Sequence, residues 1–227
     1  MQPNLTNNNV TLTGVIDSPF TFSHKVYDEG FYTFYVSVSR LSEAYDRIPI
    51  TISERLVNIE KLPMGVQVAI EGQLRSYNSY DTEYKRNKLI LTVFTKELTL
   101  VTEPWDIEDP SEPLYLKSLV HSKTPNEIML NGYICKPPVF RTTPFGREIT
   151  DILLAVNRSY NKSDYIPCIA WGRNARYIAN MAVGDNIKIY GRIQSRVYQK
   201  RQENGDTQEK TAYEVSVSKV EVASDIA

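Results

Sequence analysis

The chain carries one pattern twice, and the two copies lie about 118 residues apart. Gly14 recurs as Gly132, and the strand-like segment 35–40 recurs as 153–158. Other positions recur in the same order: Asp46 as Asp164, Gly65 as Gly184, Gly72 as Gly191 and Ser76 as Ser195. A nearly constant offset held over several segments predicts two copies of one domain.

Both copies alternate strand patterns with turn signals in one order. Strands are expected at residues 10–16, 32–40, 48–53, 66–77 and 89–101, and again at 128–135, 149–157, 165–171, 187–198 and 213–222. A helix is expected after the third strand of each copy, at 54–62 and at 173–181. This order is that of the OB-fold, a five-stranded Greek-key barrel. We predict a mainly β chain of two tandem OB-folds; the helix disfavours the alternative, an SH3-like barrel.

A proline-containing segment separates the copies. Residues 102–124 hold five acidic residues against two lysines, which is typical of a semi-rigid spacer. We predict a diverged OB-fold domain at 1–101, this acidic linker, and a second OB-fold domain at 125–227. Within the second domain, the proline-rich segment 136–148 is predicted to be a loop.

Charge differs between the two halves, although the net charge is -1. Residues 1–124 carry 12 Lys and Arg against 16 Asp and Glu, whereas residues 125–227 carry 14 against 11. The positive excess of the second half suits a polyanionic partner, although ordinary surface variation is an alternative explanation.

The sequence holds no signal of catalysis. His24 and His121 have no matching nucleophile or carboxylate motif, and no phosphate-cradling loop occurs. Cys135 and Cys168 lack zinc-ligand spacing and are interpreted as buried residues of a reducing compartment. No apolar run reaches the roughly 18 residues needed to cross a membrane. We expect a cytoplasmic protein that is not an enzyme and has no catalytic residue, metal or cofactor.

Aromatic and basic side chains interleave near the strand ends of the second copy. Unpaired bases stack on aromatic rings for about 1–3 kcal/mol each, and phosphates gain from Lys and Arg through counterion release. The cluster predicts sequence-tolerant binding of single-stranded nucleic acid, although packing explains any single tyrosine equally well. The candidates are Arg141, Arg147, Arg158, Tyr160, Lys162, Tyr165, Trp171, Arg173, Arg192, Arg196, Tyr198, Lys200 and Arg201, with Tyr45, Tyr77 and Tyr80 in the first copy.

The second copy resembles the bacterial single-stranded DNA-binding protein (SSB) family. The resemblance covers about residues 126–223, and the first copy matches more faintly over about 8–101. It implies OB-folds that wrap single-stranded DNA in replication, recombination and repair, without cofactor. The segments that carry it are 128–132 (IMLNG), 153–160 (LLAVNRSY), 164–173 (DYIPCIAWGR), 175–181, Gly184 and 191–198 (GRIQSRVY).

The resemblance also assigns base-stacking positions, and these differ between the copies. In the second copy they are Tyr160, Tyr165, Trp171 and Tyr198. In the first copy they hold Ser42, Arg47, Ser53 and Ser79, so every stacking ring is lost. We expect the second copy to carry the binding and the first to serve dimerisation or spacing.

Partners follow from the same resemblance. Family members with one OB-fold per chain form tetramers, so two per chain imply a homodimer with four, associated with the nucleoid. The family's acidic C-terminal tip, which recruits replication or repair proteins, has no counterpart in residues 224–227, so recruitment through such a peptide is not expected. The alternative is an interaction module resembling primosomal replication protein N, which bridges replication-restart proteins and DNA. RNA binding is a remoter alternative, because stacking does not distinguish the two sugars.

Overall fold

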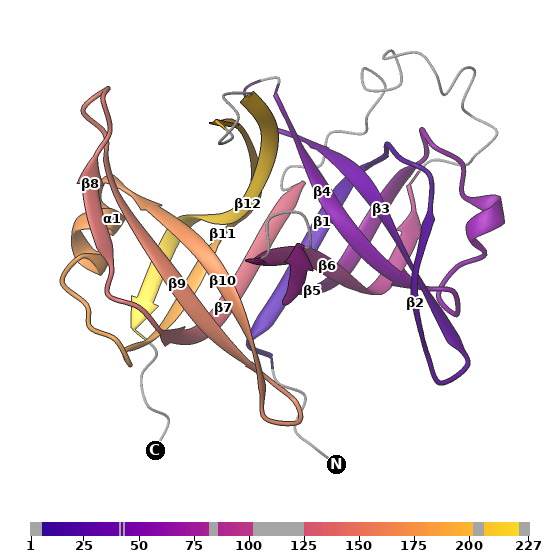
Figure 1. The fold of residues 1–227 in the computed structure, drawn as a ribbon, viewed down its shortest axis with the longest axis horizontal. Helices are drawn as coiled ribbons and strands as arrows, with labels where there is room; N and C mark the ends of the chain where they lie inside the picture. Colours follow the sequence, from indigo (N-terminus) through magenta and orange to yellow (C-terminus); the bar gives the residue numbers. More distant parts are fainter. Residues whose placement is uncertain are drawn as a thin grey trace.

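The computed structural model describes residues 6–40, 42, 44–81, 86–101, 125–201 and 207–222. The two halves lie side by side in Figure 1. The first half contains β1 (Asn8–Ile16), β2 (Thr21–Val26), β3 (Glu29–Ser39), β4 (Tyr45–Ser53), the 3-10 helix η1 (Ile59–Lys61), β5 (Gln67–Asp81) and β6 (Arg86–Leu100). The second contains β7 (Asn126–Ile134), β8 (Val139–Thr142), β9 (Glu148–Arg158), β10 (Lys162–Trp171), α1 (Gly172–Ile178), β11 (Asn186–Arg201) and β12 (Thr207–Val222).

Each half closes into a five-stranded barrel through the same pairings. In the first half, β1 pairs with β3 and β5, β3 pairs with β4, and β5 pairs with β6, all antiparallel. A parallel pair between β4 and β6 completes the ring. Strands β7, β9, β10, β12 and β11 repeat the pattern, with β10 and β12 parallel. The predicted tandem OB-folds are therefore confirmed.

The recurring glycines of the opening strands lie where two strands of each barrel approach each other closely. A Cβ on Gly14 would lie 2.5 Å from the carbonyl oxygen of Ser37, and one on Gly132 would lie 2.5 Å from that of Ala155. Any side chain there would push β1 off β3, or β7 off β9. The repeat therefore preserves a packing requirement at both barrels.

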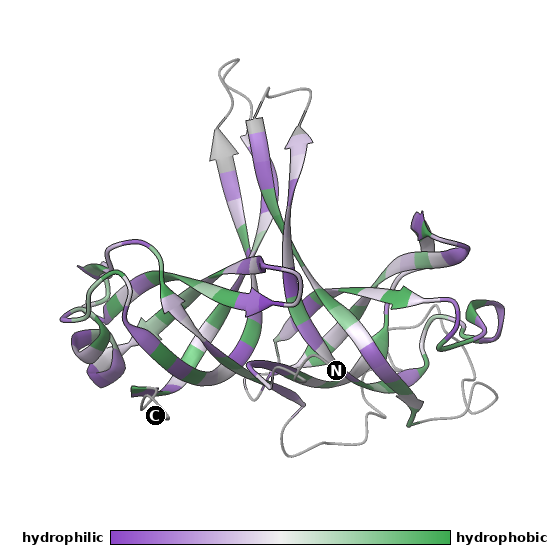
Figure 2. Cartoon of the chain, turned by 90° about the horizontal axis from the view of Figure 1, so that it is seen from below, coloured by the Kyte–Doolittle hydropathy of each residue, from purple (hydrophilic) through white to green (hydrophobic). Residues whose placement is uncertain are grey.

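Strands β1 and β7 pair with each other, so both barrels share one twelve-stranded sheet. The antiparallel register runs from Asn8 opposite Leu130 to Leu12 opposite Asn126. The long hairpins β5–β6 and β11–β12 project from the same side of the molecule, as Figure 2 shows. Because β1 and β7 cover each other's edges, separating the barrels would leave two bare strand edges.

Two buried carboxylates cross between the barrels in a reciprocal way. Asp46 of β4 accepts a hydrogen bond from the backbone N–H of Ser195 on β11, at 2.7 Å. Asp164 of β10 accepts one from the backbone N–H of Ser76 on β5, at 2.8 Å. Each long hairpin is therefore fastened to the opposite barrel by residues that recur in the two copies. We call these contacts the Asp46 junction and the Asp164 junction.

Arginines neutralise these carboxylates. Asp46, which is 1% exposed, accepts hydrogen bonds from Arg40 and from Nη1 of Arg192, the latter at 2.7 Å. Asp164 lies 3.5 Å from Nη1 of Arg158. A buried carboxylate is costly unless it is paired and hydrogen-bonded, and the two barrels supply these partners together.

One predicted helix is wrong. Of residues 54–62, only η1 is helical. The Glu54 carboxylate accepts a hydrogen bond from the N–H of Gly30 at 2.8 Å, which draws its side chain toward β3. Asn58 caps η1 with its own side chain, so the helical turn begins late. Asn favours caps over helix interiors because it hydrogen-bonds to nearby backbone.

The other expectations hold in part. The second predicted helix is confirmed as α1, although it ends at Ile178 rather than at residue 181. The predicted loop 136–148 contains β8, which pairs with β9 as an added edge strand. The linker at 102–124 lies outside the described residues, so both domain boundaries stay predictions.

The Asp46 junction generates a test of stability. Asp46→Asn removes the charge between Arg40 and Arg192 and should lower the free energy of unfolding by about 3 kcal/mol, since it breaks a buried charge network. Asp151→Asn, which breaks an ion pair with Arg141 on the surface, is the control and should cost less than about 1 kcal/mol. Urea unfolding measures both, and equal losses would contradict this role of Asp46.

Candidate nucleic-acid interface

Exposed aromatic rings gather on the second barrel. Tyr165 lies on β10, where alternation turns the neighbouring side chains inward. Trp171 ends β10 just before α1, and Tyr198 lies on β11. Tyr160 stands in the turn after β9 with a positive φ of 63°. All four rings are at least 37% exposed, so each presents a flat apolar face to solvent.

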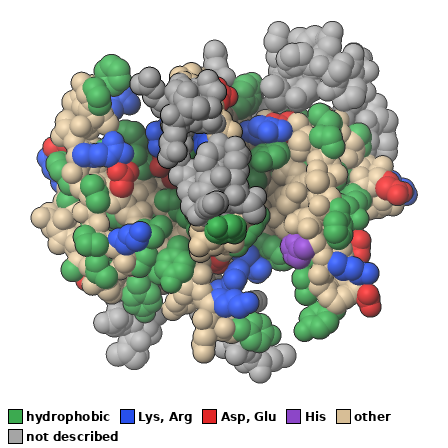
Figure 3. Space-filling model, viewed as in Figure 1, with side chains coloured by type: hydrophobic (Ala, Val, Ile, Leu, Met, Phe, Trp, Pro, Cys, Tyr) green, Lys and Arg blue, Asp and Glu red, His purple; other side chains and the backbone are tan. Residues whose placement is uncertain are grey.

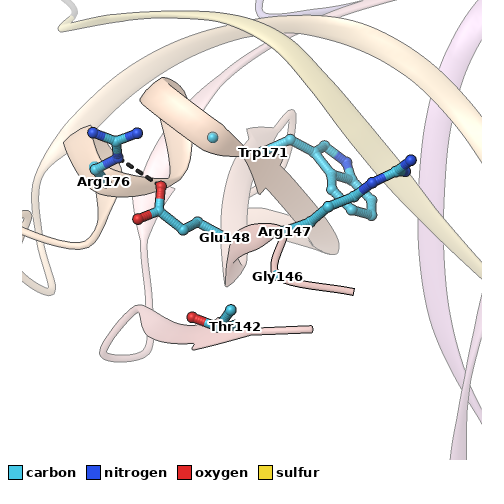
Figure 4. Close-up of a pocket in the computed structure, with 7 residues that line it drawn as sticks. Thr142, Gly146, Arg147, Glu148, Trp171 and Arg176 are labelled. Carbon is cyan, nitrogen blue, oxygen red and sulfur yellow. Dashed lines mark hydrogen bonds and ion pairs between the residues drawn. The ribbon is translucent and has the colours of Figure 1, made fainter. Parts of the chain in front are cut away.

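Trp171 lines a surface pocket with residues of the β8–β9 turn. In Figure 4 the side chain of Arg147 extends alongside the Trp171 ring. On another side of the pocket, Nε of Arg176 donates to the Glu148 carboxylate at 2.6 Å. Gly172, with a positive φ of 53°, leaves space around its Cα. Because Glu148 and Arg176 neutralise each other, Arg147 gives the pocket a net positive charge beside an aromatic face.

The predicted basic residues fall into two groups. Four lie with their side chains exposed: Arg147, Lys162, Arg173 and Arg196. The guanidinium of Arg196 lies 5.8 Å from the ring centroid of Tyr198, so these two β11 residues form a basic and aromatic pair. Figure 3 shows Lys and Arg side chains interspersed with hydrophobic ones over the second barrel.

The other basic candidates are held by carboxylates. Arg141 donates to Asp151 at 2.7 Å on the surface. Arg158 and Arg192 belong to the Asp164 and Asp46 junctions. The side chains of Lys200 and Arg201, at the end of β11, lie outside the described residues.

The first barrel uses the matching positions for internal contacts. The guanidinium of Arg47, which stands where the second copy has Tyr165, lies 4.0 Å from the Tyr35 ring centroid and 3.0 Å from a carboxylate oxygen of Asp17. Ser53, which stands where the second copy has Trp171, is buried and donates to Glu29. The other two positions, Ser42 and Ser79, are exposed. The first barrel therefore has no ring at these four positions and no free cation at Arg47.

A tyrosine of the second barrel also contacts this part of the first barrel. Tyr213 of β12 contacts Tyr35 of β3 across the Asp46 junction. Burial, together with the charge and hydrogen bond of Tyr35, raises the pKa of Tyr213 to about 12. The sequence offered no signal of this contact, because the two tyrosines belong to different copies and follow no shared motif.

The first-barrel candidates lie on β4 and β5, two strands that contact the second barrel. Tyr45 begins β4, and Tyr77 and Tyr80 are exposed on β5. Ser76, next to Tyr77, accepts a hydrogen bond from the backbone N–H of Tyr165 at 2.7 Å. The structure thus places β5, the strand that carries Tyr77, against β10, the strand that carries Tyr165.

Some classes of site are not found among the described residues. No group of three or more His, Cys, Asp or Glu side chains in the ranges given above is arranged to hold a metal ion. Neither α1 nor η1 is long and apolar enough to span a bilayer.

Residues 125–223 match the model of the Single-strand binding protein family. A single-stranded DNA-binding protein of Clostridium tetani is 40% identical over 81 residues, which are 33% of this chain and 56% of that protein. The chain spans about half the length of the curated relatives it matches. The resemblance of the second copy is confirmed.

One solved structure shares the fold of nearly the whole chain, and another matches less than half of it. The wild-type single-stranded DNA binding protein of Thermus aquaticus has a TM-score of 0.68 over 96% of this chain and 93% of its own, at 16% sequence identity, so the likeness shows the fold. The N-terminal domain of PriB protein from Thermoanaerobacter tencongensis is 47% identical over 43% of this chain and 99% of its own, with a TM-score of 0.37.

The raised pKa of Tyr213 predicts a loss of stability in alkali. The folded state holds this proton up to about pH 12, whereas a tyrosine in the unfolded chain releases it near 10.0. The folded state therefore binds more protons between these values, and stability falls as the pH rises through them. Tyr213→Phe should lose less free energy of unfolding than the unmodified chain between about pH 9 and about pH 12. Tyr133→Phe, on β7, is the control; an unchanged alkaline loss in Tyr213→Phe would contradict the contact.

Proposed function

We propose that the chain binds single-stranded DNA without sequence preference, mainly through its second barrel, because residues 125–223 match the model of the Single-strand binding protein family. The observation that carries this proposal is the contrast between the barrels at four matching positions. The second barrel exposes Tyr160, Tyr165, Trp171 and Tyr198 there, whereas the first holds Arg47 and Ser53 in internal contacts.

The chemistry of the exposed set suits a single strand. Each base has a flat face that stacks on an aromatic ring, which contributes about 1–3 kcal/mol per base and depends little on base identity. Phosphates between the bases release counterions when they meet Lys and Arg. Arg147 beside Trp171, and Arg196 beside Tyr198, place a cation next to a ring at two separate points. Such pairs suit one nucleotide each, with its base on the ring and its phosphate on the cation.

We place this binding in the protection of single-stranded DNA during replication, recombination or repair, in the cytoplasm at the nucleoid. No enzymatic step is part of the proposal. The remaining candidates, Arg141, Lys162, Arg173, Lys200 and Arg201, are assigned to phosphate contacts along the same track. The alternative is a bridging module for replication-restart proteins, which the ring-poor first barrel favours.

A homodimer of four barrels is also proposed. The first barrel, freed from stacking, is the half available for contacts between chains. Light scattering should give a mass near two chains, about twice 26.0 kDa. A mass near one chain at micromolar concentration would contradict the dimer without affecting DNA binding.

Titration of labelled oligo-dT, followed by fluorescence anisotropy, tests the binding. The unmodified chain should bind, with affinity that falls as salt rises. Trp171→Ala and Tyr198→Ala should each weaken binding by about 1–3 kcal/mol, since each removes a stacking face. Tyr133→Ala, which removes a similarly exposed ring from β7, is the matched control and should bind as the unmodified chain does.

Two outcomes would contradict the proposal. Absence of oligo-dT binding at low salt would exclude DNA coating and leave the bridging module. A large preference for one base composition over a mixed-sequence strand would exclude sequence tolerance.

A further inference from the structure

The two junctions carry the same carboxylate but different arginines. At the Asp46 junction, Arg40 and Arg192 both bind Asp46, so two guanidiniums and one buried carboxylate form a closed triad. At the Asp164 junction, Arg158 stands 3.5 Å from Asp164, and no other arginine of the described chain lies within ion-pair distance of it. Asp164 therefore has one arginine partner at a longer distance, whereas Asp46 has two closer ones.

The first copy has no arginine at the position that matches Arg192. Its nearest arginine lies two positions later on β5. Residues 192–194 read Arg-Ile-Gln, whereas the matching residues 73–75 read Gln-Leu-Arg. Arg75 therefore does not take the place of Arg192. Its guanidinium lies 3.9 Å from the Phe94 ring centroid, and one terminal nitrogen donates weakly to Gln73, at 3.3 Å. Its Nε is buried with no hydrogen-bond partner among the described residues.

The Asp164 junction consequently holds two arginines, Arg75 and Arg158, against one carboxylate, and Arg75 forms no direct ion pair with it. Asp164 already accepts the Ser76 N–H and faces Arg158, and Arg75 has no carboxylate of its own in the described chain. Burial, followed by repulsion from Arg158, lowers the pKa of Arg75, and attraction to Asp164 opposes these two effects. A partly buried cation without a direct ion pair is a costly arrangement. An anion bound beside the two guanidiniums would relieve their repulsion.

Two exposed tyrosines from different barrels follow the junction residues in the chain, since Tyr165 follows Asp164 and Tyr77 follows Ser76. The hydrogen bond from Tyr165 to Ser76 fixes β10 beside β5, and Tyr77 follows Ser76 directly. Tyr165 is 47% exposed and Tyr77 is 51% exposed. The strands that carry these two rings therefore meet where Ser76 and Asp164 join the barrels.

The Asp46 junction lacks these features. There the backbone N–H of Arg47 donates to the hydroxyl of Ser195 at 3.2 Å, and the residue after Ser195 is Arg196. No ring occupies either matching position, and Arg47 is held by Asp17.

We propose that Arg75 and Arg158 bind a phosphate of the single strand at the Asp164 junction, where the strand crosses from Tyr165 of the second barrel to Tyr77 of the first. This inference rests on the proposed function and adds to it a composite site. One barrel supplies Tyr165 and Arg158, and the hairpin of the other supplies Arg75 and Tyr77. The first barrel then contributes through its long hairpin and not through its own stacking positions.

Salt titration of oligo-dT binding by the full chain tests this site. Loss of one phosphate contact should reduce the slope of log K against log [salt] by about 0.7. We expect this reduction in Arg75→Gln, a change that the fold should tolerate because the second copy has Gln194 at the matching position. Arg75→Lys keeps the charge and should keep the slope. Arg40→Gln, at the closed triad, is the matched control and should also keep it.

The outcomes separate the two proposals. A slope that falls in Arg75→Gln but not in Arg40→Gln or Arg75→Lys supports the composite site. A slope unchanged in Arg75→Gln, or equally reduced in Arg40→Gln, overturns it while leaving the proposed function intact. Failure of the unmodified chain to bind oligo-dT overturns both. Thermal unfolding of each variant shows whether a slope is measured on folded protein.

Discussion

The reciprocal contacts between the two barrels determine the rest of the structure. The N–H of Ser195 reaches Asp46, and that of Ser76 reaches Asp164, so each hairpin is fixed to the opposite barrel by a buried carboxylate. Together with the β1–β7 pairing, these contacts set where both hairpins project. Because buried carboxylates need exact partners, neither barrel can rotate against the other without leaving a charge unpaired. A rigid arrangement allows a composite surface to form at the junction.

Duplication within one chain permits asymmetry that identical subunits cannot have. Both copies keep the glycine of the opening strand and the aspartate and serine of the junction, since these maintain barrel closure and the contacts between the barrels. At the four stacking positions the copies differ. One copy turns Trp171 and Tyr165 to solvent, whereas the other holds Ser53 and Arg47 in hydrogen bonds and a ring contact. The first barrel thus has internal contacts at the positions where the second barrel has exposed rings. Its long hairpin contacts the second barrel.

The sequence predicted the barrels well because strand alternation and recurring glycines are local signals. It predicted the helix at 54–62 wrongly, because Glu54 is recruited by Gly30, a residue far away in sequence. It identified Trp171 and Tyr165 through their family pattern, and the structure places both at the surface. It missed Arg75, because the charges that surround this residue, Arg158 and Asp164, belong to the other copy. Contacts between copies have no periodicity to reveal them.

The central claim is that a single strand follows the second barrel and crosses to the first only at the Asp164 junction. Amide hydrogen exchange of the full chain, measured with and without saturating oligo-dT, tests it most directly. We expect added protection in β10, in the exposed part of β11 and in β5 around Tyr77, with none in β4 around Arg47. Equal protection of β4 and β10 would contradict it, because it would show that both barrels bind the strand alike.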